Sequence, residues 1–475
     1  MKNIYIFIFS IFFISNVQAQ AFSLDTSFNV NYTLNYFGIG GKVNGLNYEP
    51  DGKLMIFGSF WDGIQSLSDV LRIYEDGSLD NTWQFKGTTG SLDFGYIKRM
   101  NNEYVLFVPS PGAFGKCTYY GQITDTAWSN NVLRGNICHQ FYYPYFFSDG
   151  SMLVGGDSSC NIVSDKKRCF MKFLPDGNID TNFKHGTNRA VSGIVKYSSD
   201  KLLLYSYGFT KYDTITTNRM CRIDTLGNYD TTFKSIFISG NPTPVYVQDD
   251  GKVIVCGGFH IINNPLELCL IRLNADGSLD STFNNFTLHS IGNGVGSVCP
   301  SSDGGYLIGG GFNQYQAYTR NNIVKTDING FIDTTYFNGL GIDSVFDNAG
   351  RTPYVINIVK GTNDTYYVMG YFTYYNGVSV NPIIRIHGLS AGINEVEKEN
   401  VKVFPNPATN SITFNTGMYK DFILTIFNAI GQTVMQKQLA TSITTLNIQS
   451  FQQGMYYYQL INDKGKVISG KFVKE

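Results

Sequence analysis

A short pattern recurs about every 50 residues through most of the chain, and it limits the sequence to folds that grow by adding similar units. The pattern is a mostly apolar residue, Asp, two small or polar residues and an aromatic residue. It first occurs at residues 24–28 as Leu-Asp-Thr-Ser-Phe. Its seven copies, of which the one at 124–128 is weaker, end in aromatic residues at positions 28, 83, 128, 183, 233, 283 and 336.

Asp-Gly pairs divide each complete unit into strands. They begin at residues 51, 76, 149, 176, 250, 276 and 303, and paired members lie 25 to 27 residues apart. Asp-Gly between apolar runs predicts a hairpin turn, because glycine accepts the positive φ that such turns need. In the fifth unit we expect strands at 244–248, 252–259 and 267–274, with the marker 279–283 as the fourth. Four antiparallel strands per repeat predict the blades of a β-propeller.

The return strand of a unit usually ends in glycine followed by an aromatic residue, as at 257–259 and 310–312. Glycine there would allow neighbouring backbones to approach closely near a crowded axis.

The two ends of the repeat region predict how the ring closes. The last unit stops at Gly388 without a marker, whereas the marker at 24–28 has no unit before it. We therefore expect the N-terminal segment to supply the missing outer strand, which removes the exposed edges. The fold class is all-β: a seven-bladed β-propeller over residues 22–390, with an open solenoid as the alternative.

Composition agrees with β structure and excludes some functions. Charged residues are only 15% of the chain and aromatic residues are 15%. The 36 Lys and Arg nearly balance the 37 Asp and Glu, and a nucleic-acid-binding protein needs a basic excess to neutralise phosphates. We expect no nucleic-acid partner.

The first 20 residues predict a signal peptide. Lys2 precedes an apolar run at 4–14, and small and polar residues follow, with cleavage expected after residues 19–21. The run is short for a bilayer, and no later stretch approaches 20 apolar residues, so no transmembrane segment is expected. An N-terminal core strand is the alternative for this segment.

The repeat region resembles the delta-60 family of bacterial propeller repeats. The shared pattern is strand, Asp-Gly, strand, Gly-Gly-Phe, then Arg-Ile/Leu, a second Asp-Gly and the marker. It is clear in units one, three, four, five and six, and degraded in units two and seven. The resemblance covers about three quarters of the chain and implies a propeller, without an assigned reaction.

A polar stretch at 391–400 predicts a linker to a separate domain at 401–475. Short alternating runs follow it, including 422–428, 433–439, 444–449, 454–458 and 467–473. About seven strands in 75 residues predict a small immunoglobulin-like β-sandwich.

The tail closely resembles the type A C-terminal sorting domain of the type IX secretion system of Bacteroidota. Three motifs carry the resemblance: Phe-Pro-Asn-Pro at 404–407, Gly-Met-Tyr-Tyr at 454–457 and Lys-Phe-Val-Lys at 471–474. It implies passage through the periplasm, recognition by the secretion machinery, and release or anchoring at the surface. A surface sandwich without a sorting role is the alternative. The residues assigned to sorting are Phe404, Pro405, Asn406, Pro407, Gly454, Tyr456 and Lys471.

Residues that could carry chemistry are dispersed. The marker residues Asp80, Asp180, Asp230, Asp280 and Asp333 each follow a hairpin, where a carboxylate commonly caps backbone N–H groups. The five histidines lack metal-ligand spacing, and no phosphate-binding loop occurs. We expect no catalytic residue, metal or cofactor. Eight cysteines in an exported chain leave both disulfides and buried free thiols open.

Function is predicted only in outline. Both Asp-Gly turns of a blade lie on one face, so the variable loops lie on the other, where binding residues are expected. Aromatic residues in those loops suit protein or glycan binding, unless they pack loop against loop. The hypothesis is a non-enzymatic exported binding protein. The alternatives are a carbohydrate-active enzyme using non-repeat acids, and a structural surface component. The candidate ligand-binding residues are Trp61, Tyr212, Tyr315, Tyr318, Tyr374 and Tyr375.

Overall fold

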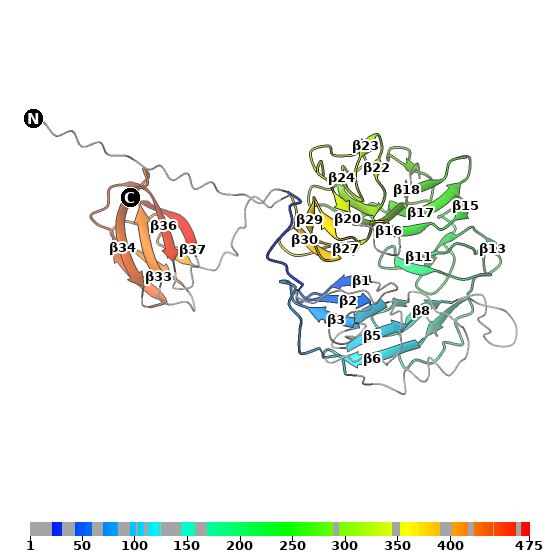
Figure 1. Cartoon of the computed structure of the whole chain (residues 1–475). Coiled ribbons are helices and arrows are strands. Elements are labelled where there is room, and N and C mark those ends of the chain that lie inside the picture. Colours follow the sequence, from blue (N-terminus) through cyan, green and yellow to red (C-terminus); the bar gives the residue numbers. More distant parts are fainter. Residues whose placement is uncertain are drawn as a thin grey trace, which may run out of the picture. The chain divides into compact units, whose positions relative to one another are not determined.

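A computed structural model describes most of the chain as two compact units, residues 1–392 and 393–475 (Figure 1). The described residues are 21–30, 43–58, 70–83, 96–100, 103–108, 113–122, 124, 144–156, 169–287, 294–343, 352–389, 401–416, 422–439, 441–461 and 467–475. They contain strands and no helix. The predicted signal peptide and linker lie outside them. Accordingly, the described part has no helix with the length and apolar character to cross a membrane.

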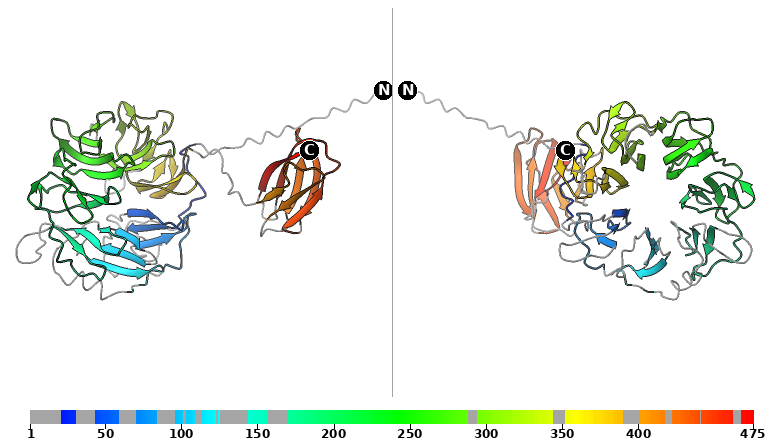
Figure 2. Two further views of the ribbon diagram at one scale, coloured as in Figure 1. Left: turned by 180° about the vertical axis from the view of Figure 1, so that it is seen from behind. Right: turned by 45° about the vertical axis from the view of Figure 1, so that its right-hand side comes forward.

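The first unit is built from antiparallel sheets of three main strands arranged around a ring, and two short strands extend the fifth sheet to five strands (Figure 2). In each sheet the strands lie side by side in sequence order, as hairpin connections require. The sheets are β1-β2-β3 (Val43–Tyr48, Leu54–Gly58, Val70–Ile73), β4-β5-β6 (Tyr96–Met100, Glu103–Val108, Ala113–Thr118), β7-β8-β9 (Tyr145–Phe146, Met152–Gly155, Phe170–Phe173), β10-β11-β14 (Gly193–Lys196, Lys201–Tyr205, Met220–Asp224), β16-β17-β18 (Thr243–Val247, Val253–Ile261, Leu268–Leu273), β20-β21-β24 (Gly294–Pro300, Tyr306–Gly311, Ile323–Thr326) and β26-β27-β30 (Tyr354–Lys360, Thr365–Tyr371, Ile383–His387).

Asp-Gly pairs form the predicted turns. The glycines of all seven pairs have φ between 82° and 90°. In the first of them Gly52 N–H donates to Glu49 O at 3.0 Å, and in the second Gly77 N–H donates to Tyr74 O at 2.9 Å. A side chain at these φ values would be strained, which explains the recurrence of glycine.

The marker forms a single bridge instead of the fourth strand that the sequence predicted. Leu79 bridges Ile73, Leu279 bridges Leu273, and the markers at 179, 229 and 332 do the same in their own sheets. The Asp that follows bonds backbone groups of its own segment: Thr282 N–H donates to Asp280 Oδ1 at 2.9 Å. In the fifth unit the chain then pairs with the third strand again, where Leu268 is opposite Thr287.

The N-terminal segment bridges the last sheet in the same register. Leu24 pairs with Ile386, and Asp25 N–H donates to Arg385 O at 2.9 Å. Within the fifth unit, Asp280 N–H donates to Arg272 O at the same distance. The tyrosine hydroxyl of Tyr375 also donates to Phe22 O. Leu24 and Asp25 therefore make with β30 the two contacts that Leu279 and Asp280 make with β18.

Apolar side chains fill the space between adjacent sheets. One cluster joins Cys256 and Leu270 of one sheet to Val298 and Ile308 of the next. Glycines allow close approach: a Cβ at Gly309 would clash with Val355 of the neighbouring sheet, and a Cβ at Gly310, one of the predicted positions, would clash with Gly294 O of its own sheet.

Short strands decorate the sheets in the loops between second and third strands and in the connections between sheets. They are β12 (Lys211–Tyr212), β13 (Ile215–Thr216), β15 (Phe237–Gly240), β19 (Phe286–Thr287), β22 (Gln314–Tyr315), β23 (Tyr318–Thr319), β25 (Ile342–Asp343), β28 (Tyr374–Tyr375) and β29 (Val378–Ser379).

The second unit has two antiparallel sheets around one apolar core. The core joins Ile412, Phe414 and Leu446 of one sheet to Leu424 and Leu460 of the other. The sheets are β31-β32-β35 (Lys402–Phe404, Ser411–Asn415, Ile443–Asn447) and β34-β33-β36-β37 (Thr433–Leu439, Phe422–Phe427, Gly454–Ile461, Val467–Lys474).

Candidate functional site

Three small hairpins carry most of the predicted ligand-binding aromatic residues. They are β12-β13, β22-β23 and β28-β29, which lie between the second and third strands of three sheets. In each one a residue with positive φ follows the tyrosine: Asp213 (51°), Gln316 (54°) and Asn376 (48°). A two-residue turn of this kind matches the twist of a hairpin, so these loops are regular extensions of the fold.

The hairpins bury the tyrosines that were expected to bind a ligand. Tyr212 and Tyr315 have no exposed surface, and Tyr375 is 2% exposed. Tyr212 donates its hydroxyl hydrogen bond to Gly227 O at 2.6 Å, and Tyr315 donates to Gly330 O at 3.0 Å. Both carbonyls lie in the turn after the third strand, so each hairpin folds back along its own sheet. The prediction that these three rings contact a ligand is wrong, because they are core residues.

The other predicted aromatic residues have different environments. Tyr318 is 45% exposed and lies next to Arg320, whose guanidinium carbon is 5.8 Å from the ring centre. Tyr374 is half-buried in β28, where it pairs with Asp343 of β25. Trp61 lies outside the described residues. Tyr318 and Tyr374 remain candidates for binding.

An exposed apolar residue recurs three positions after each buried tyrosine. The residues are Ile215, Tyr318 and Val378, which are 38%, 45% and 54% exposed. We call these three the hairpin tips. Since the same position is solvent-exposed in three sheets, its apolar character is not required by the core. Leu340 (63% exposed) lies beside the third tip, against Gly377. Exposed apolar groups that recur in this way are typical of interaction surfaces.

The repeated Asp residues are structural, as predicted. Each marker Asp described accepts the N–H two residues ahead of it, for example Thr232 N–H to Asp230 Oδ1 at 2.9 Å. In Asp80, Asp230 and Asp280 the second carboxylate oxygen also accepts from an arginine eight residues earlier in sequence: Arg222 Nε lies 2.8 Å from Asp230 Oδ2. The same pair forms between Arg72 and Asp80 at 2.7 Å.

The arginine was not predicted to have a role, yet it links neighbouring sheets. Arg272 Nη1 donates to Ile328 O of the next unit at 2.7 Å, and its guanidinium carbon lies 5.0 Å from the centre of the Phe283 ring. Arg385 makes the equivalent set across the chain ends, with Asp25 Oδ2 at 2.7 Å and with Glu75 O. The signal was available in the sequence: an arginine lies eight residues before the marker Asp in several units.

The ion pairs also change the acidity of the carboxyl groups of Asp80 and Asp280. Burial of Asp280 opposes its ionisation. Hydrogen bonds from Thr282 and Lys252, together with Arg272, outweigh burial and lower its pKa below the usual range. The pKa of Asp80 is lowered for the same reasons, with Thr82 and Lys53 as donors.

Two acidic residues, Glu49 and Asp51, lie between the first and second sheets. Glu49 is 4% exposed, and burial raises its pKa, whereas Asp51 has a lowered pKa because hydrogen bonds, the first from Tyr119, outweigh burial. Arg99 Nη1 lies 3.9 Å from Glu49 Oε2 and 3.5 Å from Asp51 Oδ2. Opposed shifts in two carboxyl groups are typical of acid–base pairs, but Glu49 is closed to a substrate.

Histidines and cysteines in the described part do not form a metal centre. No group of three or more His, Cys, Asp or Glu residues comes together among the described residues. His185 Nδ1 lies 2.8 Å from Asp213 Oδ2, and His260 Nδ1 lies 2.9 Å from Ser239 Oγ, in separate units. Five described cysteines are buried free thiols, Cys117, Cys221, Cys256, Cys269 and Cys299, and Cys169 is also buried.

The sorting motifs divide between the core and the surface of the second unit. Tyr456 is 6% exposed, and its ring stacks on Phe472 with centres 5.5 Å apart. Asn406 Oδ1 accepts Val473 N–H at 2.9 Å, which attaches the exposed Phe404–Pro405–Asn406–Pro407 loop to the last strand. Gly454, with φ of 147°, begins β36. Lys471 is exposed on β37.

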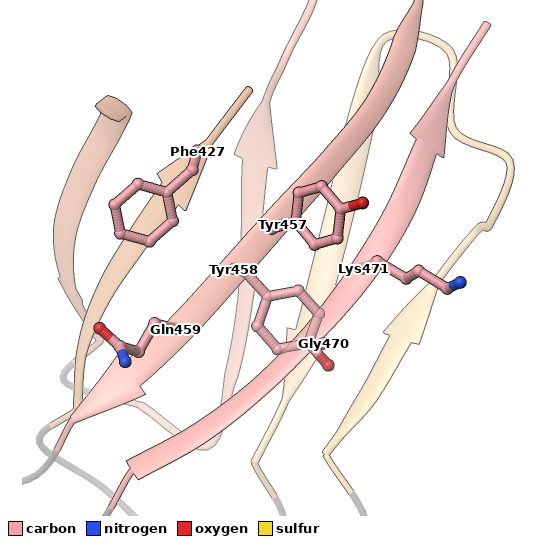
Figure 3. Close-up of a pocket in the computed structure, with 6 residues that line it drawn as sticks. All are labelled: Phe427, Tyr457, Tyr458, Gln459, Gly470 and Lys471. Atoms are coloured by element: carbon pink, nitrogen blue, oxygen red, sulfur yellow. The ribbon is translucent and has the colours of Figure 1, made fainter. Parts of the chain in front are cut away.

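A shallow hollow lies on the outer side of the four-stranded sheet of this unit (Figure 3). Its volume is about 500 Å³. Strands β33, β36 and β37 supply its walls and floor. The residues that line it are Phe427, Tyr457, Tyr458, Gln459, Gly470 and Lys471.

Sequence families match both units. The beta-propeller family DUF5122, a domain of unknown function, matches residues 49–82, 148–183, 248–283 and 301–336. The secretion system C-terminal sorting domain matches residues 402–475. No curated protein matches the chain.

Solved structures of other bacterial proteins share a distant likeness. One is PorZ, an essential surface component of the type-IX secretion system of Porphyromonas gingivalis, at 10% identity and a TM-score of 0.37, covering 91% of this chain and 65% of that chain. Another is the extracellular domain of the hybrid two component system BT4673 of B. thetaiotaomicron, at 10% identity and a TM-score of 0.44, covering 96% and 59%. The chain thus spans less than two thirds of the length of either structure.

The family matches agree with the all-β sheets of the first unit and with the motifs of the second. Residues 402–475 are a C-terminal sorting domain of type IX secretion, which directs the protein to the cell surface or the exterior, and the repeats that precede it are those of a DUF5122 β-propeller.

Proposed function

We propose that the protein is a non-enzymatic propeller that binds another protein at or outside the cell surface, delivered there by its sorting domain. One observation carries this proposal: an exposed apolar side chain recurs at Ile215, Tyr318 and Val378, whereas the tyrosines beside them are buried. Stacking on a sugar needs an exposed aromatic face, and two of the three hairpin tips are aliphatic. Apolar tips on regular hairpins fit a protein surface better than a glycan.

The proposed scaffold is a ring of seven blades spanning residues 22–390, closed by residues 22–28. The Leu24–Ile386 bridge and the Arg385–Asp25 ion pair support it, because both repeat contacts that other units make within themselves. The contact of Arg385 with Glu75 O then joins the last unit to the first. A closed ring is a rigid support that holds the hairpins at fixed separations.

The proposed tail is an immunoglobulin-like sandwich over residues 401–475. Its sheet orders, β31-β32-β35 and β34-β33-β36-β37, support this, because they match the two sheets of that fold with one edge strand moved. The proposed linker spans residues 391–400, and the proposed signal peptide spans residues 1–20.

A carbohydrate-active enzyme using non-repeat acids is the second candidate: Glu49 is such an acid and burial raises its pKa, whereas Asp51 belongs to a repeated Asp-Gly pair. Burial of Glu49 weighs against it, because a general acid must reach the scissile bond. A structural surface component without a soluble ligand fits the same export signal and is an outcome of the test below.

The test compares binding by the full chain and by a variant with all three hairpin tips changed to serine (Ile215→Ser, Tyr318→Ser, Val378→Ser). A matched control changes three exposed apolar residues in the turns that follow third strands: Leu226→Ser, Ile328→Ser and Phe331→Ser. Cross-linking on intact cells and a glycan array measure protein and sugar binding. We expect one cross-linked protein to be lost with the tip variant and kept with the control. Glycan binding that survives the tip changes, or polysaccharide turnover, would contradict the proposal.

A further inference from the structure

The outer face of the four-stranded sheet in the sorting domain is unusually apolar for a solvent-facing sheet. Strand residues alternate between faces, so residues next to buried ones point outward. Ile423 and Met455 are 46% and 38% exposed, and Tyr457 is 47% exposed. A sheet with one face on the core normally presents polar residues on the other face. This face therefore carries an apolar strip that the core does not need.

Phe427, Tyr457 and Lys471 form one row across three strands of this face. Phe427 is directly opposite Tyr457, and Tyr457 is directly opposite Lys471. Figure 3 shows the rings of Phe427 and Tyr457 over neighbouring strands, with the Lys471 amine directed away from the rings. The hollow of about 500 Å³ lies along this row. We call the three residues the outer row.

Two members of the outer row, Tyr457 and Lys471, belong to sorting motifs, and neither of them is part of the apolar core. Within Gly-Met-Tyr-Tyr, Tyr456 fills the core, whereas Tyr457 is exposed. Within Lys-Phe-Val-Lys, Phe472 is fully buried, whereas Lys471 is exposed. In the described part of the chain, Lys471 makes no ion pair, so its charge is available to a partner. Each motif thus pairs a core residue with an exposed neighbour.

Charge indicates the chemistry of that partner. Residues 401–475 contain seven Lys, no Arg and three acidic residues, whereas the whole chain is nearly neutral. The exposed lysines Lys437 and Lys471 lie on strands β34 and β37 of the four-stranded sheet. A basic surface with an apolar centre is complementary to an acidic protein surface with an apolar projection.

We propose that the outer row is the surface that the secretion machinery recognises, and that the part of the machinery that binds the outer row is an acidic protein surface. A carboxylate pairs with Lys471, while an apolar side chain enters the hollow beside Phe427 and Tyr457. This inference rests on the sorting role of residues 402–475.

The experiment follows export of the full chain in a bacterium that has type IX secretion. The test variant is Tyr457→Ser with Lys471→Glu. The matched control is Ile443→Ser with Lys402→Glu, which makes the same change of charge and a similar loss of apolar area on the other sheet, where Ile443 is 58% exposed. The ratio of external to periplasmic protein is measured by immunoblot, and folding by melting of the periplasmic protein.

We expect the test variant to reduce the external fraction about tenfold, the effect of removing one anchor of an interface, and the control to change it by less than about twofold. A Lys471→Arg variant keeps the charge and is expected to be exported normally. If the double variant melts abnormally, Lys471→Glu alone decides, because its side chain lies in solvent.

Three outcomes separate this inference from the sorting role itself. Normal export of Tyr457→Ser with Lys471→Glu would overturn the outer row as the recognised surface. Equal loss by Lys471→Arg and Lys471→Glu would overturn the acidic partner. Export of a chain lacking residues 402–475 would overturn the sorting role on which the inference depends.

Discussion

The propeller and the sorting domain use their recurrent residues in different ways. In the propeller, most repeated residues serve the fold: Arg272 contacts both Asp280 and Phe283, and the hairpin tyrosines Tyr212, Tyr315 and Tyr375 are buried. In the sorting domain, a motif such as Gly-Met-Tyr-Tyr combines the buried Tyr456 with the exposed Tyr457. A residue repeated in every blade meets a need common to all blades. A motif that occurs once can also meet the need of a partner.

Deleting residues 22–30 is expected to have the largest effect on the stability of the propeller relative to that of the sorting domain. The deletion removes the Leu24–Ile386 bridge and leaves Arg385 without its carboxylate. We expect the propeller to lose more than about 4 kcal/mol of stability, since a partly buried charge loses its partner and a strand edge is exposed. Calorimetry of the full chain measures it, with the sorting-domain transition as the internal control. An unchanged propeller midpoint would contradict ring closure.

Arg272→Ala tests whether one repeated arginine supports the ring. Arg272 and Asp280 are both nearly inaccessible, with 4% exposed side chains, and lie 2.7 Å apart. Asp280 then keeps Lys252 as its cationic partner at 2.9 Å, so the loss of the hydrogen bonds made by Arg272 is expected to cost about 1.5–3 kcal/mol in the free energy of unfolding. Urea unfolding provides the measurement, and Lys211→Ala, at an exposed position in β12, is the control. Equal stability of the two variants would show that the ion pair is dispensable.

Low pH is expected to destabilise the propeller more than the sorting domain. The lowered pKa values of Asp80, Asp230 and Asp280 mean that folding favours their ionised forms. This stability is present above the unfolded pKa of about 3.9 and is lost as the pH falls below it. We expect the propeller midpoint to fall below about pH 4 more steeply than that of the sorting domain. Melting from pH 6 to pH 2.5 measures both, and Asp280→Asn should flatten the propeller curve. Parallel curves for both regions would contradict this assignment.

The sequence repeat made the fold of the propeller predictable, but it did not predict the side-chain environments within that fold. Asp-Gly spacing located the turns, because positive φ leaves glycine as the unstrained residue. Burial of Tyr212 and Tyr315 could not be predicted, since it depends on hairpins that fold back to the turns at Gly227 and Gly330. Those hydrogen bonds join residues 15 positions apart in sequence, and they form only once the whole sheet has packed.

The sorting domain was predictable as motifs but not as surfaces. Alternation along β36 predicts that neighbouring tyrosines face opposite sides, yet it does not say which side is the core. Only the pairing of β36 with β33 and β37 places Tyr457 between Phe427 and Lys471.

Tyr456→Phe gives the smallest expected effect and tests the separation of core from surface within one motif. The change removes the hydroxyl that donates to Gln452 O at 2.8 Å and leaves the ring stacked on Phe472. The loss of one hydrogen bond is expected to lower sorting-domain stability by about 0.5–1.5 kcal/mol. Export is expected to stay within about twofold of the unaltered chain, because the side chain faces the core. Urea unfolding and the external-to-periplasmic ratio are measured on the same preparations, beside Tyr457→Phe, which keeps the exposed ring. Lost export at unchanged stability would place recognition at Tyr456, and the division of the motif into a core residue and an exposed residue would then be wrong.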